Sequence, residues 1–306
     1  MNRVNEEKGT VIVLVAFLML IFLVLLALVV DVGMLYLERI ELVNTLDAVV
    51  LSGVQELPDD PLAAEDIAQE YAANNGLDSG QVTINVIASN QIEATGKENV
   101  AMNFAPAIGI EEVEITSTSK AQISQVNAVT GIVPFGIVQQ NFVYGESYYL
   151  KYGAGDPANA QGLNGNFGAL ALDGTGAKNY EDNIKHGYDS QLKVGDEVTT
   201  EPGNMSGPTR KGVEYRVDQC NHVPGCSYDT VKPDCPRLLY VPVIDDLGNG
   251  RSTSEVVGFA AFFLEGMDKE QGNSYVEGRF IKWLADSAEM GSDGQNFGLR
   301  KVKLID

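Results

Sequence analysis

An unbroken apolar run is the clearest pattern in the chain. Residues 11–30 read VIVLVAFLMLIFLVLLALVV, and at about 1.5 Å per residue such a helix crosses a hydrocarbon core of about 30 Å. A cleaved signal peptide usually has a shorter apolar region followed by small residues, whereas Asp31 follows this run directly. A core helix of a soluble protein rarely lacks polar residues over such a length. The run therefore predicts one transmembrane helix.

Helical spacing of apolar residues continues beyond Asp31. Five of them return to one face and are candidate interface residues, namely Val32, Leu35, Leu42, Leu46 and Val49. Pro58 cannot easily continue a helix, so the pattern predicts one long helix from about Thr10 to Leu57, half in lipid and half beyond it. We expect the five residues either to bind a partner protein or to pack on a sheet of the same chain.

A short second helix is predicted after Pro58. Asp60 suits the N-cap, and Pro61 suits the first helical position, where its missing N–H is not needed. Asn75 and Gly76 supply a C-terminal stop.

Alternating apolar and polar residues then predict three strands. They fall at about 82–86, 92–104 and 113–123. Together with the two helices, this small antiparallel sheet forms an expected α+β domain over residues 31–125.

The residue pattern changes in the second half of the chain, where short apolar segments are separated by Gly, Pro, Asn and Asp. We expect a second, mainly β domain over residues 126–306, with a strand pair at 237–243 and 255–264 and a single helix at 178–186. The predicted fold class is thus α+β: an N-terminal transmembrane helix continuing into a long helix packed on a small antiparallel sheet, followed by a β-rich exoplasmic domain.

The charge balance excludes one class of partner. The 306 residues include 42 Asp and Glu against 21 Lys and Arg, a formal net charge of -21. Such a surface repels phosphate backbones, so nucleic acid is not an expected partner. With 44% hydrophobic residues, 11 Phe and 12 Tyr, the chain has the composition of a folded protein.

The flanks of the apolar run indicate its orientation. Arg3 and Lys8 precede it, although Glu6 and Glu7 lie beside them. The positive-inside rule favours a cytoplasmic tail at residues 1–10. We therefore expect a single-pass protein of the cytoplasmic membrane whose bulk lies outside the cell.

Three cysteines gather in one short stretch, at Cys220, Cys226 and Cys235. In an exoplasmic compartment a local disulfide is the expected chemistry, although spacing does not tell which pair bonds. With His222 the cysteines form C-x-H-x3-C-x8-C, so a tetrahedral zinc site and free thiols are alternatives. The zinc alternative matches no common finger spacing, and the sequence predicts neither a metal nor a cofactor.

Catalytic residues are not expected. Only His186 and His222 are available for histidine chemistry, and no nucleophile motif such as G-x-S-x-G accompanies them. The carboxylates are scattered, and sequence alone pairs none of them across a cleft.

Several segments of the N-terminal third resemble one family in order and spacing. They are Leu26–Tyr36, Leu46–Gly53, Gln55–Pro61, Ala68–Gly76 and Phe104–Ile110. Over about residues 8–125 the chain resembles the Tad/Flp pilus-assembly family of TadG-like and TadE-like membrane proteins. Prepilins of such systems carry Glu five residues after their cleavage site, whereas Leu14 stands at that place after Gly9. A retained anchor fits this difference.

The resemblance implies a membrane-anchored structural or assembly component of a Tad/Flp-type pilus or secretion system. Its implied partners are the lipid bilayer and pilus or Tad platform proteins, and self-association is open. The alternative is a cell-surface receptor or adhesin that recognises glycan or peptide. A third hypothesis is an anchored hydrolase, which requires convergent carboxylates around a reactive centre.

Overall fold

The computed structural model describes residues 4–151, 166–270, 273–285, 288–291 and 295–305. The chain forms two compact units. Unit 1 comprises Met1–Ile123 with Val302–Asp306, and unit 2 comprises Ser124–Lys301. Both units combine helices with strands, so the predicted α+β class is confirmed.

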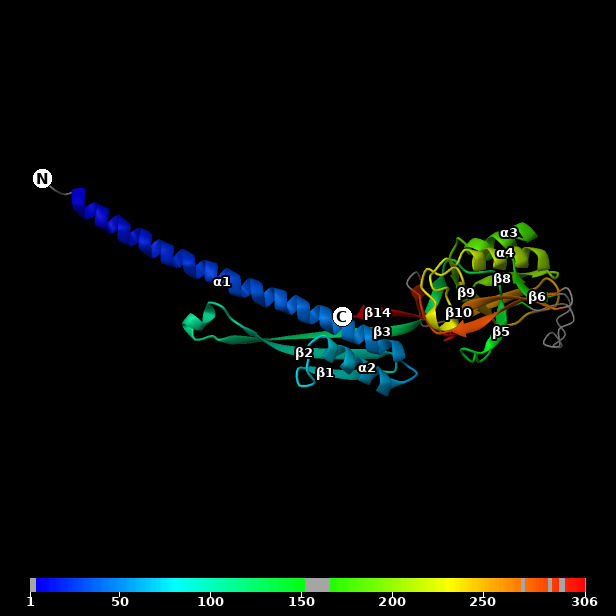
Figure 1. The fold of residues 1–306 in the computed structure, drawn as a ribbon, viewed down its shortest axis with the longest axis horizontal. Helices are drawn as coiled ribbons and strands as arrows, with labels where there is room; N and C mark the ends of the chain where they lie inside the picture. The colour runs from blue at the N-terminus through cyan, green and yellow to red at the C-terminus, as the bar shows by residue number, and fades with distance from the viewer. Residues whose placement is uncertain (1–3, 152–165, 271–272, 286–287, 292–294, 306) are drawn as a thin grey trace. The chain divides into compact units, whose positions relative to one another are not determined.

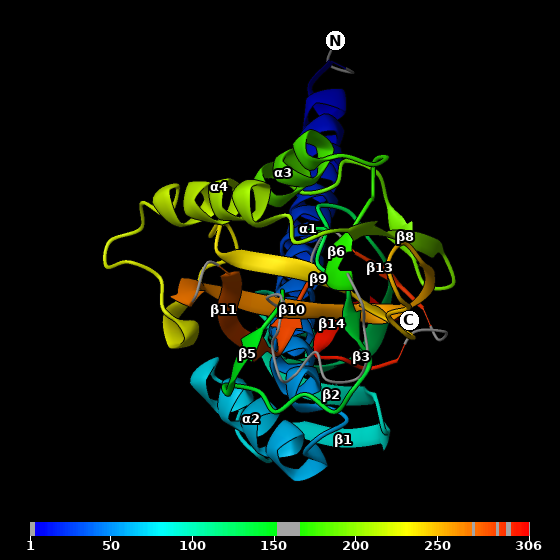
Figure 2. The same cartoon turned by 90° about the vertical axis from the view of Figure 1, so that its right-hand side faces the viewer.

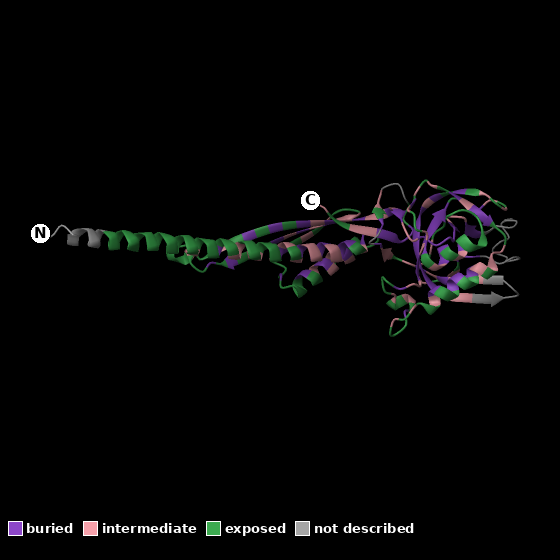
Figure 3. Cartoon of the chain, turned by 90° about the horizontal axis from the view of Figure 1, so that it is seen from above, coloured by how far each residue is buried: buried purple, intermediate pink, exposed green. Residues whose placement is uncertain are grey.

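Helix α1 runs from Val4 to Gly53 and is followed by one 3-10 turn, η1, at Val54–Glu56. The predicted long helix is confirmed, and it ends before Pro58 as the missing N–H requires. Among the described residues, α1 is the one helix long and apolar enough to cross a membrane. Side chains of residues 11–30 are exposed all round apart from the half-buried Ala27 (Figure 3).

Helix α2, Pro61–Asn74, confirms the predicted second helix and its cap. The backbone N–H of Ala63 donates to Asp60 Oδ1 at 3.0 Å, which satisfies one amide of the first turn. The helix stops at Asn75, and Gly76 adopts a φ of 87° that costs glycine little.

The sheet of unit 1 is an antiparallel meander of β1 (Val82–Ala88), β2 (Gln91–Ala101) and β3 (Glu112–Val129). Strand β14 (Leu299–Ile305) lies beside β3. All three predicted strands are confirmed, but β2 ends earlier and β3 runs further than expected. The β2–β3 connection contains the 3-10 turn η2, Ala105–Ile108.

The outer half of α1 and helix α2 pack on this sheet (Figure 1). Ile92 and Ala94 of β2 are fully buried there, as are the α2 alanines Ala64, Ala68 and Ala72. Gly53 permits the close approach, because an added Cβ would lie 2.5 Å from the Ala64 carbonyl oxygen. The core of unit 1 therefore sits between the sheet and the two helices.

Unit 2 is built on a sheet whose strand order is β4-β9-β10-β11-β5. These strands are β4 (Ile137–Val138), β5 (Ser147–Tyr149), β9 (Leu238–Ile244), β10 (Thr253–Glu270) and β11 (Asn273–Ile281). Strands β9 and β10 pair antiparallel, which confirms the predicted strand pair.

Shorter strands complete unit 2. They are β6 (Asn166–Leu170), β7 (Leu192–Lys193), β8 (Glu197–Pro202), β12 (Trp283–Leu284) and β13 (Glu289–Met290). Strand β8 pairs with both β6 and β10.

Strand β10 is covered on both faces. Phe262 and Leu264 join one buried cluster, whereas Phe259 and Ala261 join another. Successive side chains of a strand point to opposite faces, so the continuous apolar run of β10 reflects burial on both sides.

Two helices cover one face of this sheet, α3 (Ala177–His186) and α4 (Ser206–Asp218) (Figure 2). Helix α3 was predicted, but the expectation of a single helix in the second half is wrong. Gly207, Pro208 and Gly212 weaken the local helical signal of α4. Burial of Val213 in the core beside Ile184 of α3 stabilises α4 instead.

Candidate functional site

The five candidate interface residues on α1 divide into two groups. Leu42, Leu46 and Val49 are buried inside unit 1, where they pack within the chain itself. Val32 is exposed and Leu35 is half-buried. Whether Val32 and Leu35 bind a partner stays a prediction, whereas the other three side chains are already covered.

An exposed apolar stripe lies on a different face of the same helix segment. Tyr36, Leu37 and Ile40 are 65%, 66% and 39% exposed, and we call these three residues the outer stripe. At about 100° per residue Leu37 lies opposite Leu46, whereas Ile40 lies about 120° and Tyr36 about 80° from it, so the stripe extends from the far side of the helix to the flank of its buried face. The prediction from sequence periodicity chose the buried face, because the apolar residues of that face recur more regularly. The signal for the outer stripe is that this helix segment also carries apolar residues outside that face.

Asp31, the first residue after the apolar run, holds the β2–β3 connection against α1. Its carboxylate accepts backbone N–H groups of Asn103, Phe104 and Ala105 at 2.7–3.2 Å. Burial disfavours the ionised carboxylate, but these three bonds outweigh that effect and lower the pKa of Asp31. The N-cap residue of η2, Phe104, makes no side-chain hydrogen bond to the turn. The carboxylate of Asp31 supplies the missing acceptor, because it accepts the N–H of Ala105 in the first position of η2.

The connection that Asp31 holds exposes large apolar side chains. Phe104, Ile108 and Ile110 are all exposed, and Ile108 reaches 80%. We call Phe104–Ile110 the apolar loop. Because its backbone is bonded to the residue that directly follows the apolar run, this loop lies beside the end of the predicted membrane span.

A cluster of sulfur and imidazole side chains forms in unit 2, between α4 and β9. Cys220 lies two residues beyond the end of α4, and Cys235 precedes the start of β9 by three residues. One ligand atom from each of Cys220, His222, Cys226 and Cys235 lies within 4.8 Å of all the others. The Sγ atoms of Cys220 and Cys235 are 3.6 Å apart, and His222 Nδ1 is 3.9 Å from Cys220 Sγ. The structure brings together all three sequence-predicted cysteines, and the predicted disulfide stays a prediction.

The loop that carries the cluster is attached firmly to β10. Arg237 donates to the backbone oxygens of Leu264, Glu265 and Cys226 at 2.8–3.2 Å. Its guanidinium lies 4.7 Å from the ring centre of Phe263, and that ring packs against Cys226 and Cys235. The cluster is therefore built on a strand of the core.

The thiols of the cluster differ in acidity. The hydrogen bond from His222 lowers the pKa of Cys220 to about 6, and the same contact raises the pKa of His222. Burial raises the pKa of the Cys235 thiol to about 12. One sulfur thus carries negative charge at neutral pH beside a sulfur that holds its proton.

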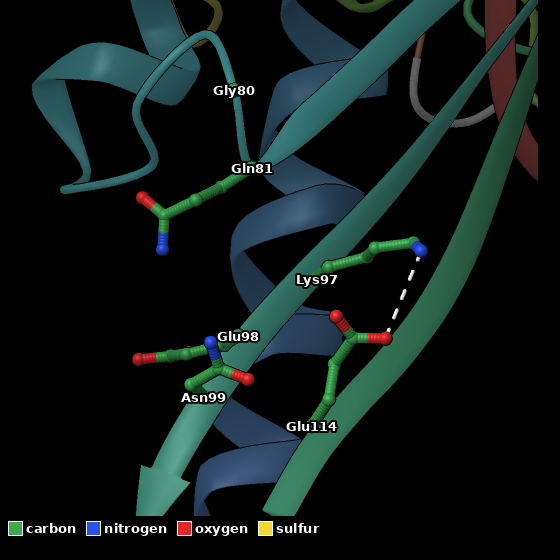
Figure 4. A pocket seen from close by; sticks show the side chains of 6 residues that line it. All are labelled: Gly80, Gln81, Lys97, Glu98, Asn99 and Glu114. Carbon is green, nitrogen blue, oxygen red and sulfur yellow. Dashed lines mark ion pairs between the residues drawn. The ribbon is translucent and has the colours of Figure 1, made fainter.

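One surface depression of unit 1 contains charged side chains but no catalytic arrangement. It is lined by Gly80, Gln81, Lys97, Glu98, Asn99 and Glu114 (Figure 4). Lys97 and Glu114 form an ion pair at 3.7 Å, with both side chains more than half exposed. Burial raises the pKa of Glu98, aided by the nearby carboxylates Glu38 and Glu41. The lining contains no nucleophile with an adjacent base, so this depression does not resemble an active site.

Comparison with known families identifies the N-terminal segment. Residues 9–56 match the Tad model of Flp pilus-assembly TadE/G-like proteins. The resemblance inferred from the sequence is confirmed for this segment, and its extension to about residue 125 stays a prediction. Neither the curated proteins nor the solved structures contain a match to the chain. The family match supports a role related to Flp pili and suggests that the role is not enzymatic.

Proposed function

We propose that the chain is a membrane-anchored, non-catalytic component of a Tad/Flp-type pilus or secretion assembly. The observation that carries the proposal is the outer stripe, an exposed apolar surface inside the segment that matches the pilus-assembly family. The stripe lies beyond the apolar run of α1 and outside the face buried by the sheet, with Leu37 opposite that face. A helix with apolar residues on a second, uncovered face is suited to packing against another helix.

In this proposal residues 11–30 form the membrane anchor, with residues 1–10 as a cytoplasmic tail. Residues 31–125 form a TadG-like domain and residues 126–306 a β-rich exoplasmic domain. The apolar loop rests in the interfacial region of the outer leaflet. Its tether through Asp31 supports this placement, because three backbone bonds hold it beside the residue that leaves the span.

The proposed partner of the outer stripe is a helix of a pilus subunit or Tad platform protein. The apolar run contains no polar side chain, so association inside the bilayer relies on packing alone. Outside the bilayer, burial of Tyr36, Leu37 and Ile40 provides a hydrophobic driving force, which is roughly 1.5–3 kcal/mol for a fully exposed leucine that becomes fully covered and less for the partly covered Ile40. The outer stripe is therefore where selectivity between partner helices is expected.

The first test is an in-frame deletion with plasmid complementation, scored by counting surface filaments in electron micrographs. We expect filaments to disappear while pilin protein remains in the membrane. A complementing chain with Tyr36→Gln, Leu37→Gln and Ile40→Gln should leave filaments absent although the protein accumulates normally. Leu62→Gln is the control, because Leu62 is even more exposed, at 75%, but lies on α2; it should restore filaments. Unchanged filament numbers after deletion would refute the assembly role and favour a receptor or adhesin.

A photocrosslinking amino acid at position 36 identifies the partner directly. A crosslink to a pilus or platform protein supports the proposal, and a crosslink between two copies of the chain shows self-association. Protease treatment of intact cells, with an epitope at each end of the chain, tests the orientation. Digestion of the N-terminal epitope, with the C-terminal one protected, would refute it.

A further inference from the structure

We propose that Cys220, His222, Cys226 and Cys235 bind one Zn²⁺ ion in a closed, four-ligand structural site. The site lies on the loop between α4 and β9 of unit 2 and shares no residue with the outer stripe, so the inference does not depend on the proposed pilus role. Three cysteines and one histidine are a common ligand set of structural zinc sites. Binding leaves three thiolates and a neutral imidazole, and the displaced protons go to solvent.

The separations between ligand atoms match a tetrahedron around zinc. With zinc–sulfur bonds of about 2.3 Å, two ligands of a regular tetrahedron are about 3.8 Å apart. The sulfurs of Cys220 and Cys235 are 3.6 Å apart, and His222 Nδ1 is 3.9 Å from Cys220 Sγ. No pair among the four ligand atoms exceeds 4.8 Å. Ligands already this close need only small side-chain movements to close on one ion.

The imidazole of His222 is oriented as a metal ligand. Its Nε2 lies 3.1 Å from Asp234 Oδ1, so this nitrogen donates its proton to the carboxylate. In the neutral imidazole that binds a metal, the lone pair of Nδ1 then faces the sulfurs. A carboxylate behind the coordinating imidazole fixes its tautomer and raises its basicity, an arrangement that accompanies most histidine ligands of metals.

Backbone N–H groups point at two of the sulfurs. Cys226 N–H bonds to Cys220 Sγ, and Arg237 N–H bonds to Cys235 Sγ. Such bonds spread the negative charge of metal-bound thiolates. The attachment of Arg237 to β10, together with the Phe263 ring, holds this half of the site on a rigid element.

A disulfide accounts for fewer of these observations. One disulfide joins two of the three sulfurs and gives no role to the third sulfur or to the paired His222 and Asp234. A zinc ion uses all four ligands and explains why the imidazole is directed by a carboxylate. The ion would close the loop between α4 and β9, whose one helical segment is the single turn η4, Tyr228–Thr230.

The test uses the full chain, anchor included. Native membranes are denatured in alkylating agent without reductant, and cysteine peptides are analysed by mass spectrometry. In parallel, the chain is purified in detergent without chelator, and zinc is measured by elemental mass spectrometry. We expect three alkylated thiols and about one zinc per chain. After replacement by Co²⁺, a visible spectrum of tetrahedral thiolate coordination should appear.

Variants separate ligation from adventitious binding. Cys220→Ser and His222→Asn should abolish stoichiometric zinc, whereas His186→Asn should retain it. Asp234→Asn changes an exposed residue and leaves all four ligands in place, so the variant should fold. It should weaken zinc binding about 10- to 100-fold in a chelator competition. Asp229→Asn is its matched control, since Asp229 is exposed on the same loop, and its affinity should equal that of wild type.

Three results would overturn the proposal. They are a disulfide between any two of the cysteines in native membranes, free thiols without zinc in the purified chain, and zinc content or affinity that is the same in Cys220→Ser and Asp234→Asn as in wild type.

Discussion

Leu46→Ala is the sharpest test of how α1 is held to its sheet. Leu46 is fully buried, and a Cβ added at Gly96 of β2 would lie 3.0 Å from its Cδ2 atom, so the leucine rests directly on the strand. The substitution removes three buried carbons, which costs about 2.4 kcal/mol at about 0.8 kcal/mol per methylene. The remaining cavity raises the total to roughly 3 kcal/mol.

Hydrogen exchange resolves the effect within unit 1. A loss of roughly 3 kcal/mol corresponds to about 150-fold faster exchange through opening of the unit, measured on peptides from β1 and β2. Leu37→Ala is the control on the same helix, because Leu37 is 66% exposed, and it should change exchange little. Equal effects of the two substitutions would refute the assignment of buried and exposed faces.

A double substitution tests the contact itself. Gly96→Ala alone should destabilise unit 1, since the new methyl also lies 3.0 Å from Leu42 Cδ1. Combined with Leu46→Ala, the methyl gains room on one side, so the pair should cost less than the sum of its parts. Strict additivity would show that Leu46 does not pack on Gly96.

Three further predictions follow from other contacts. Asp31→Asn should speed hydrogen exchange at residues 103–105 while leaving exchange in β1 unchanged. Because the pKa of Asp31 is lowered in the folded chain, the wild-type protection of these amides from exchange should be complete above the usual carboxyl pKa and should be lost only in acid. Gly212→Ala should destabilise unit 2 by about 1–3 kcal/mol, because the new Cβ would lie 2.5 Å from Ile184 Cγ2. Gly207→Ala is the control, since it changes an open position in the first turn of α4 and should not destabilise the unit. Both effects can be measured by urea unfolding followed through Trp283 fluorescence. Burial lowers the pKa of Lys151 from 10.5 to about 8, so between these pH values the unfolded chain holds a proton that the folded chain has lost, and this residue contributes a rise of stability with pH. Lys151→Met should abolish that rise, and an unchanged pH profile would contradict the assignment.

Local signals predicted the elements that depend on neighbouring residues. The apolar run, Pro58 and the cap at Asp60 set α1 and α2 within a few residues, and alternation located the strands of unit 1. Helix α4 was missed because Gly207 and Gly212 argue against a helix locally, while its stability comes from tertiary packing of Val213. The extension of β3 to Val129 was missed for a similar reason, since its pairing partners β7 and β13 come later in the chain.

The candidate site shows the same division. Local sequence was enough for the membrane-spanning length, the acidic composition, the family resemblance of α1 and the presence of three cysteines near a histidine. Three features required the folded chain: Leu46 is covered while Leu37 is not, Asp31 holds the apolar loop, and Asp234 directs His222 toward the sulfurs. Periodicity and composition are properties of neighbouring residues, whereas the choice of a covered face and the convergence of side chains depend on contacts between distant segments, which one-dimensional patterns do not encode.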